Sequence, residues 1–88
     1  MAEEILFIVN PISGTGKQKK LNKNLEKTLN YSLFNPTIVY TQHAGHATEL
    51  SREAIGKYRY VIAVGGDGTV NEVVKGLTGS ETTMGIIP

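Results

Sequence analysis

The sequence contains no cysteine, and this absence removes several classes of site at once. Without cysteine there is no disulfide framework, no thiolate zinc site and no cysteine nucleophile. The fold therefore does not depend on an oxidising compartment, and a cytoplasmic location fits best.

The chain also lacks a strong charge of one sign and a long hydrophobic run. Lys and Arg total 9 and Asp and Glu total 8, so the formal net charge is +1, which argues against a nucleic-acid-wrapping surface. The longest apolar run, residues 5–9, is far too short to span a bilayer, and it follows two glutamates, not the basic flank of a signal peptide. With 88 residues, 40% of them hydrophobic, the composition predicts one small domain with a packed core.

Four apolar segments predict β-strands and three periodic segments predict helices. The strands are expected at residues 5–9, 37–41, 60–64 and 84–88, and the first and third are continuous apolar runs typical of strands buried on both faces. The helices follow from apolar residues at helical spacing, which are Leu21, Leu25 and Leu29, then Ala47, Leu50 and Ala54, then Val70, Val73, Val74 and Leu77. Gly56 helps to close the second helix.

This β-α-β-α-β-α-β pattern predicts an α/β fold with a three-layer, doubly wound and mainly parallel sheet. The strands ending at Val9 and Val64 should be neighbours, which gives the strand order 2-1-3-4. A sheet that ends on a bare strand has an uncovered edge. Residues 1–88 are therefore expected to be the amino-terminal part of a nucleotide-binding domain. Its apolar surface from Met84 to Ile87 should make the chain either self-associate, for example as a homodimer, or remain partly loose.

A glycine-rich turn follows the strand at residues 60–64 and predicts a phosphate cradle. Gly65, Gly66 and Gly68 permit positive φ and let phosphate oxygens approach the main chain at the start of a helix. Asp67 would repel phosphate directly, so its presence indicates a magnesium-nucleotide. A purely structural reading also exists, because Thr69 and Glu72 have the spacing of a helix capping box.

The turn after the first strand excludes two common nucleotide motifs. In residues 10–17, Pro11 stands where a P-loop needs its first glycine, and Lys17 is followed by Gln18 in place of Ser or Thr. The dinucleotide fingerprint also fails, because Asn71 occupies the position of its third glycine. His43 and His46, at the start of the second helix, are interpreted as polar surface.

Three motifs together resemble the catalytic domain of the diacylglycerol kinase and sphingosine kinase family, and most closely its small bacterial lipid kinases. They are Asn10-Pro11-x-Ser13-Gly14-x-Gly16, Gly45-His46-Ala47-Thr48-Glu49 and Gly65-Gly66-Asp67-Gly68-Thr69-x-Asn71-Glu72, and they cover essentially the whole chain. The resemblance implies an α/β nucleotide domain followed by a β-rich second domain. It also implies transfer of the ATP γ-phosphoryl, with Mg²⁺, to a lipid hydroxyl such as that of diacylglycerol.

By the same resemblance, three segments contact the nucleotide, and Asp67 joins a magnesium network through water. The nucleotide-binding residues are Asn10, Pro11, Ile12, Ser13 and Gly14, then Thr41, then Gly65, Gly66, Asp67, Gly68, Thr69, Val70, Asn71 and Glu72. The implied partners are a nucleotide and a lipid at the membrane surface, with no nucleic acid, so the cytoplasmic protein is expected to make peripheral membrane contact.

No catalytic residue is assigned. The family's glycine-rich stretch after a strand like residues 85–88, and its later acidic general base, are not in the chain, so these residues alone are expected to be inactive. Two alternatives stay open. One is a kinase of the NAD kinase type, which shares the glycine turn, and the other is a non-catalytic, flavodoxin-like nucleotide-binding module.

Overall fold

A computed structural model describes residues 2–11 and 32–87. The predicted helix carrying Leu21, Leu25 and Leu29 lies outside the described residues, as do Ile12, Ser13, Gly14 and Pro88.

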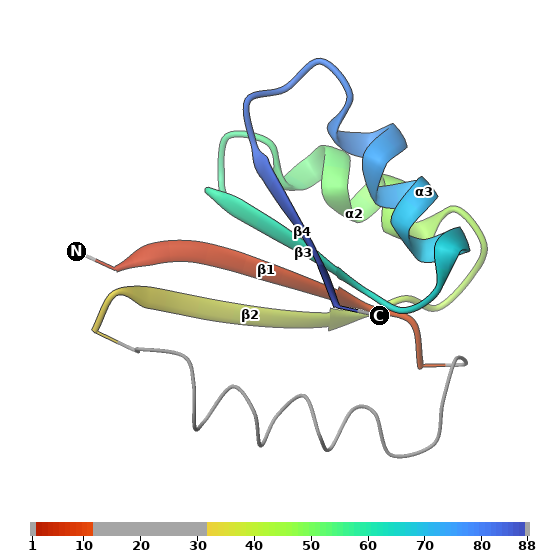
Figure 1. Cartoon of the computed structure of the whole chain (residues 1–88), viewed down its shortest axis with the longest axis horizontal. Helices are drawn as coiled ribbons and strands as arrows, with labels where there is room; N and C mark the ends of the chain where they lie inside the picture. The colour runs from red at the N-terminus through yellow and green to blue at the C-terminus, as the bar shows by residue number, and fades with distance from the viewer. Residues whose placement is uncertain (1, 12–31, 88) are drawn as a thin grey trace.

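Four parallel strands form one sheet and point the same way (Figure 1). They are β1 (Glu3–Val9), β2 (Phe34–Tyr40), β3 (Tyr60–Val64) and β4 (Thr83–Ile87). The strand order is β2-β1-β3-β4, so β1 is central and pairs with both β2 and β3. This confirms the predicted α/β class and the predicted neighbourhood of the strands that end at Val9 and Val64.

β2 begins earlier than the sequence pattern predicted. The expected start was residue 37, immediately after Pro36, but the strand already begins at Phe34 and Pro36 lies opposite Ile5 of β1. β2 is the last strand on its side of the described sheet. An edge strand tolerates proline because half of its N–H groups point away from the sheet and need no strand partner.

Two helices lie side by side on the same face of the sheet (Figure 1). They are α2 (His46–Ala54) and α3 (Asp67–Leu77). Their buried residues join those of the strands in one apolar cluster, which comprises Leu6, Ile8, Ala47, Ala54, Val61, Ala63, Val73 and Leu77. A second cluster, on the alternate residues of the strands, comprises Ile5, Phe7, Val9 and Val64. Because successive strand residues point to opposite faces, β1 is buried on both.

α2 and α3 approach each other closely at Gly76. A Cβ atom at this position would lie 2.6 Å from the carbonyl oxygen of Thr48 and closer still to Oγ of Ser51. The Thr48 hydroxyl also donates a hydrogen bond of 2.8 Å to the carbonyl oxygen of Glu72. These contacts fix the two helices against each other, at the middle of α3 through Glu72 and at its last turn through Gly76.

The helices are short. α2 has 9 residues and α3 has 11, and within residues 2–11 and 32–87 no helix has the length and apolar character needed to cross a membrane.

Candidate functional site

The carboxyl ends of the four strands are tied together by main-chain hydrogen bonds. The N–H of Thr41 donates to the carbonyl of Val9 at 2.8 Å, and the N–H of Asn10 donates to the carbonyl of Val64 at 3.1 Å. The N–H of Gly65 donates to the carbonyl of Ile87, also at 3.1 Å. The first residue after each of β2, β1 and β3 is therefore fixed against the neighbouring strand.

A cavity of about 290 Å³ opens at this edge, and we call it the edge cavity. Five predicted site residues line it, which are Asn10, Thr41, Gly68, Thr69 and Glu72. The loop after β2 and the first turn of α2 supply the other described lining residues, Gln42, His43, Ala44 and Ala47. Its volume is close to the lower end of small-ligand pockets, about 300–1,000 Å³.

Gly65 is the one glycine of the turn whose backbone requires glycine. Its φ is +150°, a conformation that other residues rarely adopt. A Cβ atom here would lie 2.9 Å from Oγ1 of Thr69 and 3.4 Å from Cβ of Asn10. The absence of a side chain at Gly65 therefore lets two residues of the edge cavity come together.

Of the three glycines that permit positive φ, Gly66 and Gly68 do not adopt it. Gly66 has φ −87°, Gly68 lies within α3, and neither is among the described residues with positive φ. A Cβ atom at either position would meet no atom of the described residues within 4 Å. Neither backbone conformation nor packing requires glycine there, and glycine inside a helix is less stable than alanine by about 1 kcal/mol. Because Gly66 and Gly68 have no side chains, the described residues leave space beside the first turn of α3.

The predicted capping box is also wrong. α3 begins at Asp67 with Gly66 at the N-cap position and no side-chain cap, so Thr69 lies inside the first turn instead of before it. The first helical hydrogen bond runs from the N–H of Val70 to the carbonyl of Gly66 at 3.1 Å. The N–H groups that precede it have no acceptor in the helix, which is the usual basis of anion binding at helix amino-termini.

The remaining predicted residues lie near the edge cavity or outside it. Gly66 and Asp67 are exposed at the start of α3, and Asn71 is exposed further along the same helix. Val70 packs against the apolar cluster under the helices. Pro11 is exposed, whereas Ile12, Ser13 and Gly14 lie outside the described residues.

The sequence interpretation missed the contribution of the loop after β2. The sequence pattern predicts that His43 is only polar surface, yet His43 lines the edge cavity together with Gln42 and Ala44. A signal was available, since Thr41 was already predicted at the carboxyl end of a strand. Residues that directly follow such a strand begin at the ligand-binding edge of a parallel sheet.

His43, His46 and Glu49 form a cluster of metal-ligating types beside the edge cavity. One ligand atom from each lies within 4.8 Å of the others. However, Nδ1 of His46 accepts a hydrogen bond from the N–H of Gln42 at 3.0 Å, which leaves the proton of the neutral ring on Nε2. A ligating nitrogen must be unprotonated, so we assign no metal ion to this cluster.

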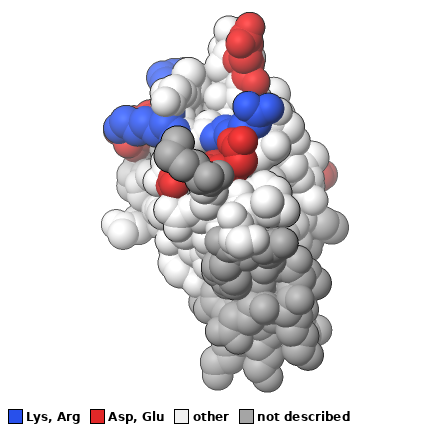
Figure 2. Space-filling model, turned by 90° about the vertical axis from the view of Figure 1, so that its left-hand side faces the viewer, with Lys and Arg blue, Asp and Glu red and all other residues white. Residues whose placement is uncertain are grey.

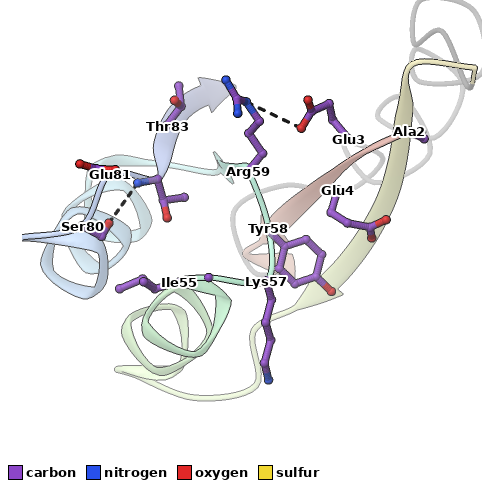
Figure 3. A pocket seen from close by; sticks show the side chains of 12 residues that line it. Ala2, Glu3, Glu4, Ile55, Lys57, Tyr58, Arg59, Ser80, Glu81 and Thr83 are labelled. Atoms are coloured by element: carbon purple, nitrogen blue, oxygen red, sulfur yellow. Dashed lines mark hydrogen bonds and ion pairs between the residues drawn. The ribbon is translucent and has the colours of Figure 1, made fainter.

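A larger hollow of about 760 Å³ lies at the opposite, amino-terminal edge of the sheet. Basic and acidic side chains lie next to one another on this side (Figure 2). Arg59 reaches toward Glu3, with Nε 3.7 Å from Oε2 (Figure 3), and a hydrogen bond with Tyr60, together with the charge of Glu3, raises the pKa of Arg59. We do not place the site here, because its charges face each other and the glycine turn is at the other edge.

A parallel α/β sheet with a glycine-rich turn and a cavity at its carboxyl edge belongs to the class of α/β domains that bind ligands at that edge. Within that class, residues 4–88 match the diacylglycerol kinase catalytic domain. The chain belongs to this family, as the three sequence motifs indicated, and this is the first of the three possibilities left open by the sequence.

Two curated relatives show the range of the family. The chain is 37% identical over 85 residues to a diacylglycerol kinase of Bacillus subtilis, covering 93% of this chain and 28% of that protein. It is 42% identical over 77 residues to sphingoid long chain base kinase 5 of Saccharomyces cerevisiae, covering 85% of this chain and 11% of that protein.

A solved structure has the same fold. A diacylglycerol kinase from Bacillus anthracis matches 98% of this chain with a TM-score of 0.76 and 36% sequence identity. The chain spans 32% of that structure, so it corresponds to less than a third of each of these proteins.

Proposed function

We propose that the edge cavity binds ATP and that the chain is the ATP-binding part of a lipid kinase. The full-length enzyme would transfer the γ-phosphoryl group to a lipid hydroxyl, as the names of its relatives suggest. The observation that carries the proposal is the pair Gly66 and Gly68 at the uncapped start of α3, where no contact with the described residues requires glycine and none of these residues fills the space.

The phosphates are proposed to lie against the first turn of α3. Main-chain N–H groups without helical acceptors point to this space, and the helix dipole adds a favourable positive potential. Gly68 and Thr69 belong both to this turn and to the wall of the edge cavity, so a nucleotide in the cavity can reach the turn.

A single exposed carboxylate, that of Asp67, is suited to Mg²⁺ bound mainly by phosphates and water. Among the described residues Asp67 belongs to no group of three potential metal ligands, so the described side chains do not surround a metal ion there. Mg²⁺ commonly keeps several waters and uses one or two carboxylates together with substrate phosphates. In this arrangement Asp67 would orient a magnesium-bound water, and the ion would offset the charge of the phosphates.

Diacylglycerol is the proposed acceptor, and its binding would lie outside these residues. The edge cavity has a volume of only about 290 Å³, and the hollow at the other edge is lined by charged groups such as Glu3, Lys57 and Arg59, so neither offers a long apolar pocket for acyl chains. The chain alone, incubated with magnesium-ATP and diacylglycerol, is therefore expected to form no phosphatidic acid. A yield above a control without protein would contradict this expectation.

The phosphate part of the proposal is tested by titrating the chain with magnesium-ATP in a calorimeter. Gly68→Leu places a bulky helix-forming side chain in the open space, so it should preserve folding and abolish ATP binding. Lys75→Leu, at an exposed position of the same helix, is the matched control and should bind ATP as the unaltered chain does. Equal ATP affinity in both variants would disprove the phosphate site.

The kinase part is tested in a chimera. Replacing the matching segment of the Bacillus subtilis diacylglycerol kinase with this chain should preserve ATP-dependent formation of phosphatidic acid, because the two segments are 37% identical. A folded chimera that binds ATP but forms no product would contradict the proposed role in lipid phosphorylation.

A further inference from the structure

Two histidine rings beside the edge cavity are held in fixed orientations by the main chain. Nδ1–H of His43 donates to the carbonyl oxygen of Ala44 at 2.9 Å, and Nδ1 of His46 accepts from the N–H of Gln42 at 3.0 Å. The rings are stacked, with centroids 4.6 Å apart and an angle of 18° between their planes. The pair is thus organised before any ligand arrives.

The contacts of His43 leave little besides its ring surface for a ligand. Nδ1 is occupied by Ala44, Nε2 lies 3.8 Å from Oε2 of Glu49, and one face of the ring lies against His46. The side chain is nevertheless 56% exposed and lines the edge cavity. His43 therefore offers a ligand the other face and the carbon edge of its imidazole ring. These surfaces suit the stacking of a flat group better than they suit proton transfer.

The edge cavity is lined by two chemically different groups of residues. Gly68, Thr69 and Glu72 belong to α3, whose amino-terminus favours phosphates. The other group consists of residues 41–44 after β2 and of Ala47. Among the described lining residues His43 is the only one with a ring, and Thr41 and Gln42, which precede it in the chain, add polar residues to the same lining. A flat surface beside hydrogen-bonding groups is the environment that a nucleobase requires.

We infer that His43, backed by His46, is the platform on which the purine base of the nucleotide stacks. The inference rests on the proposed function, because it assumes that ATP occupies the edge cavity. It assigns the base to the part of the edge cavity lined by residues 41–44 and therefore predicts that His43 contributes to the binding of nucleotides but not to the binding of inorganic phosphate chains.

The experiment compares magnesium-ATP with magnesium-tripolyphosphate, which lacks base and sugar, by calorimetry on the 88-residue chain. His43→Ala should weaken ATP binding about tenfold, within the usual range for removing a base-stacking ring, and leave tripolyphosphate binding unchanged. His43→Phe should restore ATP binding, because it replaces the ring without its nitrogens. Glu53→Ala, at an exposed position of α2, is the matched control. Circular dichroism checks that each variant remains folded.

The outcomes separate the inference from the proposed function. If the unaltered chain binds neither ligand, the proposed ATP site fails and the inference with it. If the unaltered chain binds ATP and His43→Ala binds it equally well, the site stands and the stacking role is wrong. Equal weakening of both ligands by His43→Ala, or no recovery in His43→Phe, would also overturn stacking, since it would indicate an effect on charge or local structure.

Discussion

At the scale of single residues, the glycine turn divides into positions required by the fold and positions that the fold leaves free. Gly65 has φ +150° and lies against Thr69 and Asn10. Gly66 has φ −87°, and among the described residues none lies near the position that its Cβ would take. The same residue type therefore serves two purposes, and substitutions to alanine should separate them.

Gly65→Ala should lower both stability and nucleotide binding. The strained φ and the contact with Oγ1 of Thr69 should cost about 1–3 kcal/mol of unfolding free energy, measured by urea denaturation. ATP binding should weaken as well, because Thr69 and Asn10 must move. Gly66→Ala is the matched control and should change the unfolding free energy little. Equal destabilisation of the two variants would contradict this division.

Asp67→Asn should affect ATP binding in opposite directions with and without magnesium. If Asp67 orients a magnesium-bound water, its neutralisation weakens magnesium-ATP binding, whereas metal-free ATP binds more tightly because a negative charge is removed from beside the phosphates. The measurement is ATP titration in magnesium and in a chelator. Loss of the favourable interaction with the helix dipole should lower stability by only about 0.3–1 kcal/mol. The same direction of change in both solutions would contradict the magnesium role.

At the scale of elements, the packing of α2 on α3 determines where the edge cavity has its walls. The hydroxyl of Thr48 donates a hydrogen bond to the carbonyl of Glu72. Ser51 is fully buried and donates to the carbonyl of Ala47 at 2.8 Å. Gly76 has no side chain, so the backbones of the two helices can approach each other closely. Ala47 and Glu72 accept two of these hydrogen bonds through their carbonyl oxygens, and both residues line the edge cavity. A change at the helix contact should therefore reach the site.

Substitution by alanine should change the unfolding free energy in opposite directions at two glycines of α3, Gly76 and Gly68. Gly76→Ala forces a methyl group against the Thr48 carbonyl and Ser51, so it should destabilise the chain by about 1–3 kcal/mol. Gly68→Ala faces open space and gains helix propensity, so it should stabilise by up to about 1 kcal/mol while weakening ATP binding. Thermal unfolding followed by circular dichroism gives the sign of each change. A stabilising Gly76→Ala would disprove the close helix contact.

At the scale of the whole molecule, the sheet has an apolar outer edge at β4. Ile86 is 56% exposed and Ile87 is 37% exposed, and in the described part of the chain β4 pairs with β3 alone. Unpaired strand groups beside exposed isoleucines favour association with another edge.

The chain is therefore expected to self-associate through β4. Sedimentation velocity should show an average mass that rises with concentration. Ile86→Lys should suppress association without unfolding the sheet, because a charged side chain on an edge strand disfavours pairing. Val74→Lys, which replaces a residue 49% exposed on α3, should leave association unchanged. A monomer at every concentration would contradict this role of β4.

Much of the fold followed from local pattern. The continuous apolar runs 5–9 and 60–64 predicted two buried strands because both faces of a parallel sheet are covered. The turn after β3 and the three motifs indicated the family and the strand order. The start of β2 was wrong because Pro36 was treated as a boundary, and only the edge position of the strand shows why it is tolerated.

The sequence by itself determined the α/β pattern, the glycine turn and the family. The spacing of hydrophobic residues, the positions of turn-forming residues and the spacing within motifs all depend on residues close together in the chain. Tertiary structure alone decided which residues share the edge cavity and which glycines are free, because these depend on elements distant in sequence. His43 shares the edge cavity with Gly68 and Thr69 because the parallel strands β2, β1 and β3 end at the same edge of the sheet, and Gly76 is required because α2 lies against it.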